Sequence, residues 1–158
     1  MDLFDNPYKY VIDTSAFIDL KNNYPPSVFK NTVWRDFEKN FKDKTIVSVR
    51  EVYLELKKGS DFLSTWIDNY KDSFLYPDNV ECEIVRSLQD EYEFFVEIEK
   101  NGPHADPWIV ACAQRYSVII IQHEQLKNNK QKLPFVAKEK GIKYIKIPEL
   151  FEIEKFNY

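Results

Sequence analysis

Four acidic side chains in this chain are of a type, and at positions, that could hold a metal ion together. Each follows a predicted strand or stands near the start of a predicted helix: Asp13, Glu55, Asp106 and Glu124. Carboxylates gathered in one place raise one another's pKa, so such a group persists most easily around a divalent cation. Ligation by oxygen alone suits Mg²⁺ or Mn²⁺ better than zinc, and water activated by such an ion can attack a phosphodiester. These residues therefore indicate metal-assisted hydrolysis.

Each acid also has an ordinary structural explanation. Asp13 and Asp106 could serve only as helix N-caps. Glu55, and Glu51 one turn earlier on the same helical face, could be solvated residues, and Glu124 could be a surface-loop acid. The repetition of acids at strand ends favours a shared site over these separate explanations.

The elements that must position the acids are short apolar runs alternating with helical patterns. Strands are expected at residues 10–12, 45–49, 73–76, 118–121 and 142–147. A first helix is expected after Asp13, and further helices over residues 33–41, 50–58, 60–70, 78–99, 106–116, 133–140 and 148–155. This alternation predicts the α/β class, with a parallel sheet and covering helices. Right-handed crossovers place the carboxyl ends of all strands on one edge, where such sheets bind ligands.

Local signals set the bounds and faces of these helices. Asp106 is expected to cap its helix, with Pro107 at the first helical position. The helical period that begins after Asp78 continues to about residue 99. Asp19, nearly two turns into the first helix, is expected to be solvated.

The totals indicate one globular domain over residues 1–158. A hydrophobic fraction of 44% with 16% aromatic residues argues against disorder. The net charge of −4 does not attract nucleic acid, so a polyanion would need a local basic patch or bound cations. Cys82 and Cys112 form no disulfide framework, which fits a reducing cytoplasm. With no signal peptide or spanning run, we expect a soluble cytoplasmic protein with no membrane association.

Four segments resemble motifs of the PIN-domain nucleases, and especially of the VapC-like toxins of toxin–antitoxin systems, over about residues 9–150. VIDTSAFIDL resembles the opening Asp-Thr/Ser strand–helix unit of that family. VREVYLELKKG is similar to its second motif, which selects Glu55 over Glu51. ADPWIVACA resembles the third motif, in which an Asp opens a helix, and VIIIQHE resembles the fourth.

The resemblance implies a PIN-like three-layer α/β/α sandwich and hydrolysis of RNA with Mg²⁺ or Mn²⁺. It implies that Asp13, Glu55 and Asp106 hold the principal ion, with Glu124 placing a second ion or orienting water. The hydroxyl of Thr14 or Ser15 would lie in or beside the ligand shell. The family's fourth motif is often Thr-x-Asp, whereas Gln122 and Glu124 stand here. A longer Glu can still reach a metal, and Gln122 can hydrogen-bond as the Thr does.

Partners follow from the same resemblance. RNA is the expected substrate, a small antitoxin would block the acidic cleft with a basic side chain, and a homodimer is possible. Arg50, Lys57, Lys58 and the loop 127–132 are candidates for contact with the RNA backbone, although the loop is equally well explained as a solvated turn. Exposed aromatics such as Tyr24 or Trp108 could stack on unpaired bases, but packing is the favoured role of most of them.

Three other readings compete. A phosphatase of the haloacid-dehalogenase type needs a second Asp two residues after Asp13, where Ser15 stands. A receiver domain needs an Asp after the middle strand, and the run TIVSV ends without one. A catalytically weakened PIN-like binding module stays open because of the altered fourth motif.

Overall fold

A parallel sheet lies at the centre of the chain. The computed structural model describes residues 6–92, 104–124 and 132–158. Within these residues five strands pair in the order β3-β2-β1-β4-β5, and every pair is parallel. The strands are β1 (Tyr10–Ile12), β2 (Ile46–Val49), β3 (Phe74–Leu75), β4 (Ile119–Ile121) and β5 (Tyr144–Ile145). The α/β class with a parallel sheet is therefore confirmed.

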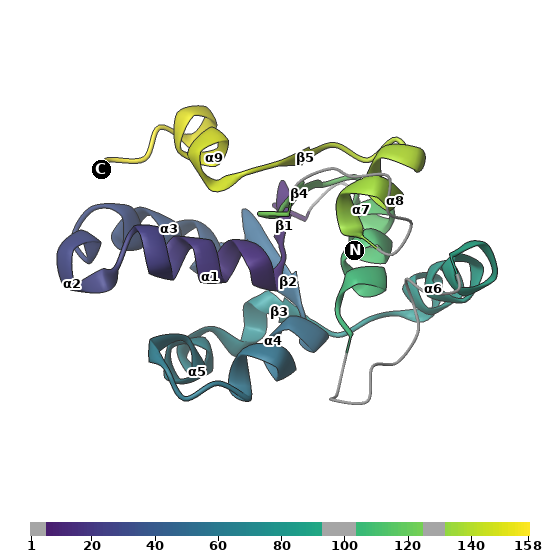
Figure 1. The fold of residues 1–158 in the computed structure, drawn as a ribbon, viewed down its shortest axis with the longest axis horizontal. Helices are drawn as coiled ribbons and strands as arrows, with labels where there is room; N and C mark the ends of the chain where they lie inside the picture. Colours follow the sequence, from purple (N-terminus) through teal and green to yellow (C-terminus); the bar gives the residue numbers. More distant parts are fainter. Residues whose placement is uncertain (1–5, 93–103, 125–131) are drawn as a thin grey trace.

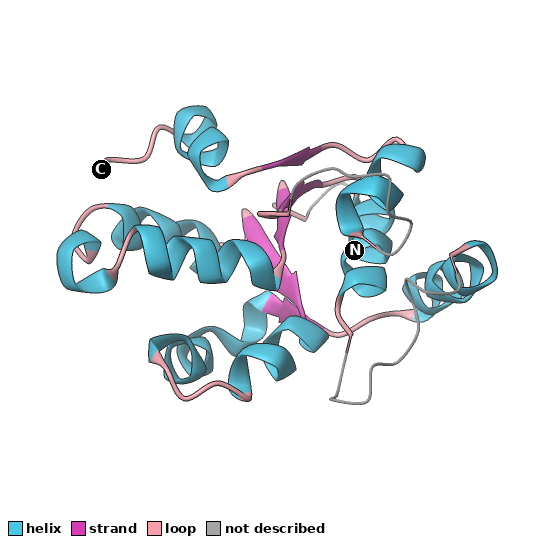
Figure 2. Ribbon diagram, in the orientation of Figure 1, coloured by secondary structure: helices cyan, strands magenta, loops and turns pink. Residues whose placement is uncertain are grey.

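Helices cover both faces of this sheet, as a three-layer sandwich requires (Figure 2). In chain order they are α1 (Thr14–Asn23), α2 (Pro26–Phe29), α3 (Val33–Lys42), α4 (Arg50–Lys57), α5 (Phe62–Trp66), the 3₁₀ helix η2 (Ile67–Ser73), α6 (Asn79–Glu91), α7 (Asp106–Tyr116), α8 (Leu133–Glu139) and α9 (Ile147–Glu154). Figure 1 shows α1 and α3 on one side of the sheet and α7 on the other. None of the helices in the described part is long and apolar enough to cross a membrane.

The strand order places a topological switch point between β1 and β4. From β1 the chain moves to α1 on one face, whereas from β4 it moves to α8, which packs beside α7 on the other face. Neighbouring strands whose connections leave to opposite faces open a crevice at their carboxyl ends, where ligands bind in such folds. Ile12 pairs with Ile121, so Asp13 and Gln122 come next on the two sides of this crevice.

An aromatic cluster holds α1 against the sheet. The Phe17 ring is fully buried, and its centroid lies 5.8–6.0 Å from the ring centroids of Phe37, Phe41, Trp66 and Phe74. Most of these rings meet edge to face, a favoured geometry that adds to the burial of their apolar area. The cluster fixes the helix that begins directly after Asp13.

Two expected helix boundaries are wrong. Helix α6 ends at Glu91 with Tyr92 as its C-cap, well before residue 99, and residues 93–103 lie outside the described residues. Ala105, not Asp106, holds the N-cap position of α7, so Asp106 is the first helical residue. The shift places Pro107 within the first turn, where its missing N–H costs nothing. It also frees the Asp106 side chain from a capping role.

A candidate metal centre at the sheet edge

Asp13 is buried at the carboxyl end of β1, with 3% of its surface exposed. Its backbone N–H donates to the carbonyl of Ile121 at 2.9 Å and extends the β1–β4 ladder by one step. Although Asp13 precedes α1, its side chain makes no capping hydrogen bond to that helix. A cap role therefore does not account for a carboxylate in this place.

Ser15 ties Asp13 to the loop after β4. The Ser15 hydroxyl donates to Asp13 Oδ2 at 2.9 Å and accepts the backbone N–H of His123 at 3.0 Å. Because a hydroxyl donor favours the charged carboxylate, this bond partly opposes the effect of burial on Asp13. Ser15 thus orients the carboxylate and joins the two sides of the crevice.

Glu55 connects the start of α1 with the start of α7. Its Oε2 accepts the Thr14 hydroxyl at 2.5 Å, and its Oε1 accepts the backbone N–H of Ala105 at 3.0 Å. Ala105 directly precedes Asp106, so one carboxylate on α4 links the start of α1 to the start of α7. Each of its oxygens keeps a further lone pair for a ligand.

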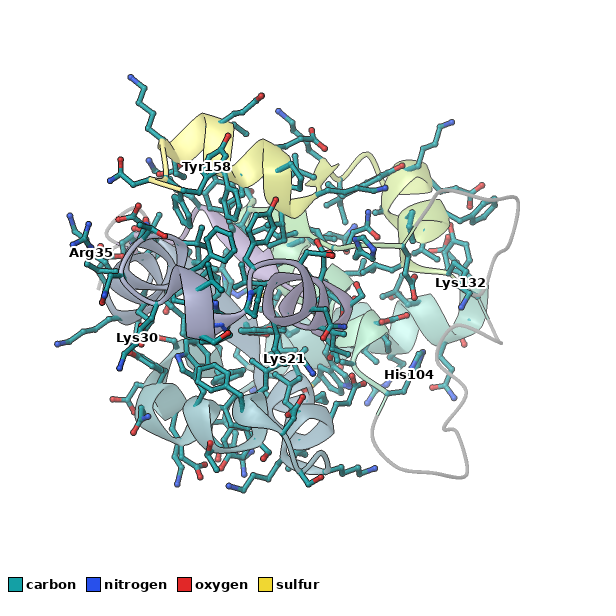
Figure 3. The ribbon with its side chains drawn as sticks, turned by 60° about the vertical axis from the view of Figure 1, so that its left-hand side comes forward. Lys21, Lys30, Arg35, His104, Lys132 and Tyr158 are labelled. Atoms are coloured by element: carbon teal, nitrogen blue, oxygen red, sulfur yellow. The ribbon has the colours of Figure 1, made fainter. Side chains whose placement is uncertain are left out.

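The four carboxylates act on one another electrostatically. Burial raises the pKa of Asp13 to about 6, and the charges of Glu55 and Glu124 add to this rise. Burial also raises the pKa of Asp106 well above its usual value, with further contributions from Asp13, Glu124 and Glu55. The charge of Lys132, at the start of α8, acts in the opposite direction. Figure 3 shows Lys132 and His104 on the flank away from Arg35.

Buried polar atoms without partners lie on the β4 side of the crevice. Gln122 is 1% exposed, yet among the described residues neither Oε1 nor Nε2 has a hydrogen-bond partner. The same holds for Oε2 of Glu124. An unpaired buried polar atom costs about 1–3 kcal/mol, so these atoms are the ones that a ligand would satisfy.

The donor chemistry fits a hard divalent cation. No group of three or more Asp, Glu, His or Cys residues in ranges 6–92, 104–124 and 132–158 has the arrangement to hold an ion as it stands. The four carboxylates nevertheless offer only oxygen donors, and Glu124 Oε2 has no hydrogen-bond partner in the described part of the chain. A cation would also remove the repulsion that raises the pKa of Asp13 and Asp106.

Glu51 is a half-buried carboxyl that interacts electrostatically with Glu55. Burial raises its pKa, the Arg50 charge opposes this and the Glu55 charge adds to it, and its Oε2 is buried without a partner among the described residues. Its charge also reaches Glu81 on α6. Glu51 therefore connects the candidate site to a second buried carboxyl.

Glu81 gives the first prediction. It is 1% exposed, its Oε1 accepts the backbone N–H of Asp78 at 3.3 Å, and burial is the main reason that its pKa rises to about 7. Because the folded pKa exceeds the unfolded value, stability falls as pH rises from about 4.5 to 7. Glu81→Gln keeps the acceptor oxygen and removes the charge. In urea unfolding above pH 7, this variant should be more stable than wild type by about 1–3 kcal/mol.

The matched control for this prediction is Glu83→Gln, on the exposed face of the same helix. The Glu83 side chain is 68% exposed and pairs with Arg86, so its loss should change stability by less than about 0.5 kcal/mol at any pH. An unchanged pH dependence in Glu81→Gln would contradict the assignment.

The expectation that Asp19 is solvated is wrong. Asp19 is 7% exposed, its Oδ1 accepts from Asn23 Nδ2, and its Oδ2 lies 3.4 Å from His123 Nδ1. Together with the Ser15 bond, this contact holds the loop after β4 against α1. The contact between Asp19 and Asn23 can be expected from their spacing of one helical turn. The contact between Asp19 and His123 cannot be expected from any local sequence pattern.

The structure describes only some of the basic residues that we expected to contact RNA. Lys57 donates to Asp68 at 2.5 Å and to the Ser64 carbonyl at 3.2 Å, so it is already engaged. Residues 125–131, which include most of the basic loop, lie outside the described residues. Arg50 lies at the same sheet edge as the acids, directly after β2.

Comparisons with known proteins place the fold. Residues 10–158 match the family model described as "Domain of unknown function (DUF4411)". Among solved structures the chain is similar to PAE2754 from Pyrobaculum aerophilum, with 15% identity, 94% of this chain and 96% of that chain covered, and a TM-score of 0.54. It is also similar to DNA-bound VapBC from Salmonella typhimurium, with 13% identity, 88% of this chain and 98% of that chain covered, and a TM-score of 0.54. A third similar structure is VapBC-1 from nontypeable Haemophilus influenzae, with 19% identity, 87% of this chain and 96% of that chain covered, and a TM-score of 0.51.

At these identities the likeness concerns the fold, which is PIN-like as the sequence motifs predicted. A search of the curated proteins found no match.

Proposed function

Since this chain belongs to the DUF4411 family and has a PIN-like fold, we propose that it is a metal-dependent endoribonuclease, acting as the toxin of a toxin–antitoxin pair. The observation that supports the proposal is the mutual electrostatic effect of four carboxylates, those of Asp13, Glu55, Asp106 and Glu124. They come from four separate segments and raise the pKa of two of their members, Asp13 and Asp106. Clustered groups with perturbed pKa values are typical of functional sites.

The side chains divide the work as follows. Asp13, Glu55 and Asp106 would hold a Mg²⁺ or Mn²⁺ ion, and Glu124 would hold a second ion or orient water. A divalent ion bound there would supply a more acidic water ligand and positive charge close to the reacting phosphate. Ser15 and Thr14 keep Asp13 and Glu55 in place through the hydrogen bonds described above.

The partners follow from this function. The substrate is RNA, and a small antitoxin blocks the acidic crevice with a basic side chain. Two solved neighbours are VapBC proteins, which motivates the antitoxin. We place the protein in the cytoplasm and allow for a homodimer.

Cleavage of labelled RNA by the purified chain tests the proposal. Wild type should cleave RNA with Mn²⁺ or Mg²⁺, lose activity with EDTA and regain it when the ion is restored. Asp13→Asn should be inactive, and Asp72→Asn, at an exposed position, should match wild type. Expression of wild type should arrest growth, and Asp13→Asn should relieve the arrest. Equal cleavage by Asp13→Asn and wild type would refute the assigned centre.

Metal binding gives a prediction that does not depend on activity. An ion at 100 times its dissociation constant stabilises the folded chain by about 2.7 kcal/mol, or roughly 5–10 °C in melting temperature. Mn²⁺ should produce this shift in wild type and in Asp72→Asn, whereas Asp13→Asn should lose most of it. Differential scanning fluorimetry measures the shift, and an equal shift in Asp13→Asn would contradict the ligand assignment.

A binding module without catalysis is the second candidate. It is favoured by the finding that no three acids, His or Cys in the described part have the arrangement to hold an ion as they stand. Calorimetry separates the two candidates, because a module with a weakened site should bind no Mn²⁺ at millimolar concentration. Binding at micromolar concentration would favour the nuclease.

A further inference from the structure

A cation and an exposed aromatic ring follow strands β2 and β3, at the same sheet edge as the acids. Val49 pairs with Leu75, so Arg50 and Tyr76 follow the ends of adjacent parallel strands, β2 and β3. The Arg50 guanidinium lies 4.3 Å from the ring centroid of Tyr53 and 5.4 Å from that of Tyr76. We call Arg50, Tyr53 and Tyr76 the stacking platform.

The base of this platform is rigid. Tyr53 is 6% exposed, its hydroxyl donates to Asp68 at 2.7 Å, and its ring meets that of Phe74 at 5.6 Å. The Arg50 guanidinium is therefore held in one place by a fixed ring on one side. An ordered guanidinium loses less entropy than a free one when it binds phosphate.

The outer side of the platform is open. Tyr76 is 71% exposed, and within the described ranges its hydroxyl has no hydrogen-bond partner. Arg50 likewise makes no hydrogen bond or ion pair with another described residue, so among these residues its five N–H donors have no acceptor. Arg50 is also the first residue of α4, where the helix dipole disfavours a cation. Helix stability therefore does not explain its place.

We propose that the stacking platform binds unpaired RNA, with one phosphate on Arg50 and one base on the Tyr76 ring, beside the proposed cleavage centre. This inference rests on the proposed function and assigns Arg50 and Tyr76 as the residues that bind the strand beside the cleavage centre. An aromatic face accepts any base, and arginine matches the geometry of phosphate. A base inside a duplex is already stacked and cannot reach such a ring.

The spacing suits a strand that runs along the sheet edge. Strands lie about 4.8 Å apart, so the end of β3 lies about 10 Å from the end of β1, where Asp13 stands. This equals about three nucleotides at a stacked rise of about 3.4 Å. The platform would therefore hold the strand a few nucleotides from the bond that is cut.

The aromatics named from the sequence do not offer the same surface. Tyr24 packs against the rings of Phe29 and Phe151, at 5.5 and 4.8 Å, and Trp108 packs against the core. Tyr76 stands out only because its ring is exposed and lies against a cation.

Binding of a short fluorescein-labelled single-stranded oligoribonucleotide, followed by anisotropy, tests the platform. The full chain carrying Asp106→Asn, in Mn²⁺, serves as the parent so that the probe is not cut. Added to this parent, Tyr76→Ala should weaken binding about 5- to 100-fold, whereas Tyr76→Phe should leave it unchanged. Arg50→Gln should reduce the slope of log K against log salt by about 0.7. The same sequence as a duplex should bind weakly and show no dependence on Tyr76.

Matched controls are Tyr158→Ala, at a ring that is 70% exposed, and Arg86→Gln, at a side chain that is 71% exposed. Binding by Tyr76→Ala within twofold of its parent, as for Tyr158→Ala, would overturn the platform, and so would equal losses for duplex and single strand. Cleavage by otherwise wild-type protein separates this failure from failure of the proposed function. If wild type and Tyr76→Ala cleave with the same KM, only the platform fails; the cleavage assay described above tests the nuclease itself. A supporting result is a higher KM with little change in kcat.

Discussion

Replacement of Asp106 by asparagine should reduce RNA cleavage by more than about 100-fold and should also make the metal-free protein more stable. Loss of an outer partner of a metal ligand already costs about 10- to 100-fold, so loss of a ligand should cost more. The stability gain has a separate cause. Burial and three neighbouring carboxylates raise the pKa of Asp106, so its charged form is unfavourable in the folded chain.

The sign of the pH effect follows from that rise. A carboxyl whose folded pKa exceeds its unfolded value holds its proton in the folded state over the interval between the two, so stability falls as pH rises through it. For Asp13 this window runs from about pH 4 to 6. In EDTA, wild type should therefore lose stability across it, and Asp106→Asn should lose less because one source of repulsion is gone.

Thermal unfolding and single-turnover cleavage measure the two effects on the same samples. Near pH 8 without metal, Asp106→Asn should melt above wild type, by about 2–4 °C for each kcal/mol of repulsion removed. Saturating Mn²⁺ should reverse the order, because only wild type gains binding energy. Asp72→Asn, at an exposed site, should match wild type in both assays. An Asp106→Asn protein that is both less stable without metal and active would contradict the arrangement.

Phe17→Ala should cost about 3–5 kcal/mol of stability, as expected for removal of a fully buried ring. Phe17 is fully buried and is the residue of α1 whose ring meets those of Phe37, Phe41, Trp66 and Phe74. Its removal leaves a cavity between α1 and the sheet that close-packed neighbours fill only in part. Since the free energy of unfolding of a typical domain is about 5–15 kcal/mol, this substitution would remove a large part of it.

Urea unfolding checks this cost, and the midpoint should fall while the slope stays constant. Phe17→Leu, which keeps most of the volume, should cost less than half as much as the alanine variant. Phe62→Ala is the positional control, because Phe62 is 41% exposed although its ring meets that of Trp34. Equal losses at Phe17 and Phe62 would show that the cluster does not organise α1.

The sheet was predictable from the sequence because its strands are short apolar runs separated by helical patterns. A parallel strand buried on both faces needs no alternation, and runs such as Tyr10–Ile12 show none. The placement of Asp13, Asp106 and Glu124 at one edge followed from the same topology. Their roles as ligands stay a prediction.

The contacts that organise the site were not predictable. Glu55 accepts a backbone N–H from Ala105, and a backbone donor carries no residue-specific signal. Asp19 approaches His123 across the crevice, a contact that depends on how β1 and β4 pair. Tyr76 follows a two-residue strand, too short to reveal that its ring would lie against Arg50. Each contact joins residues that are far apart in the chain, and local sequence patterns do not predict such contacts.

The spread of the four acids along the chain has a consequence for protein synthesis. Asp13 and Glu124 are brought near each other by the pairing of β1 with β4, and β4 is made only after about three quarters of the chain. A nascent chain therefore carries no complete acid cluster until the segment past residue 124 has left the ribosome and the non-local contacts have formed, which are the slow ones in folding. An enzyme that attacks RNA would in this way be inert throughout most of its own translation, and its activity would report that the whole sheet has closed.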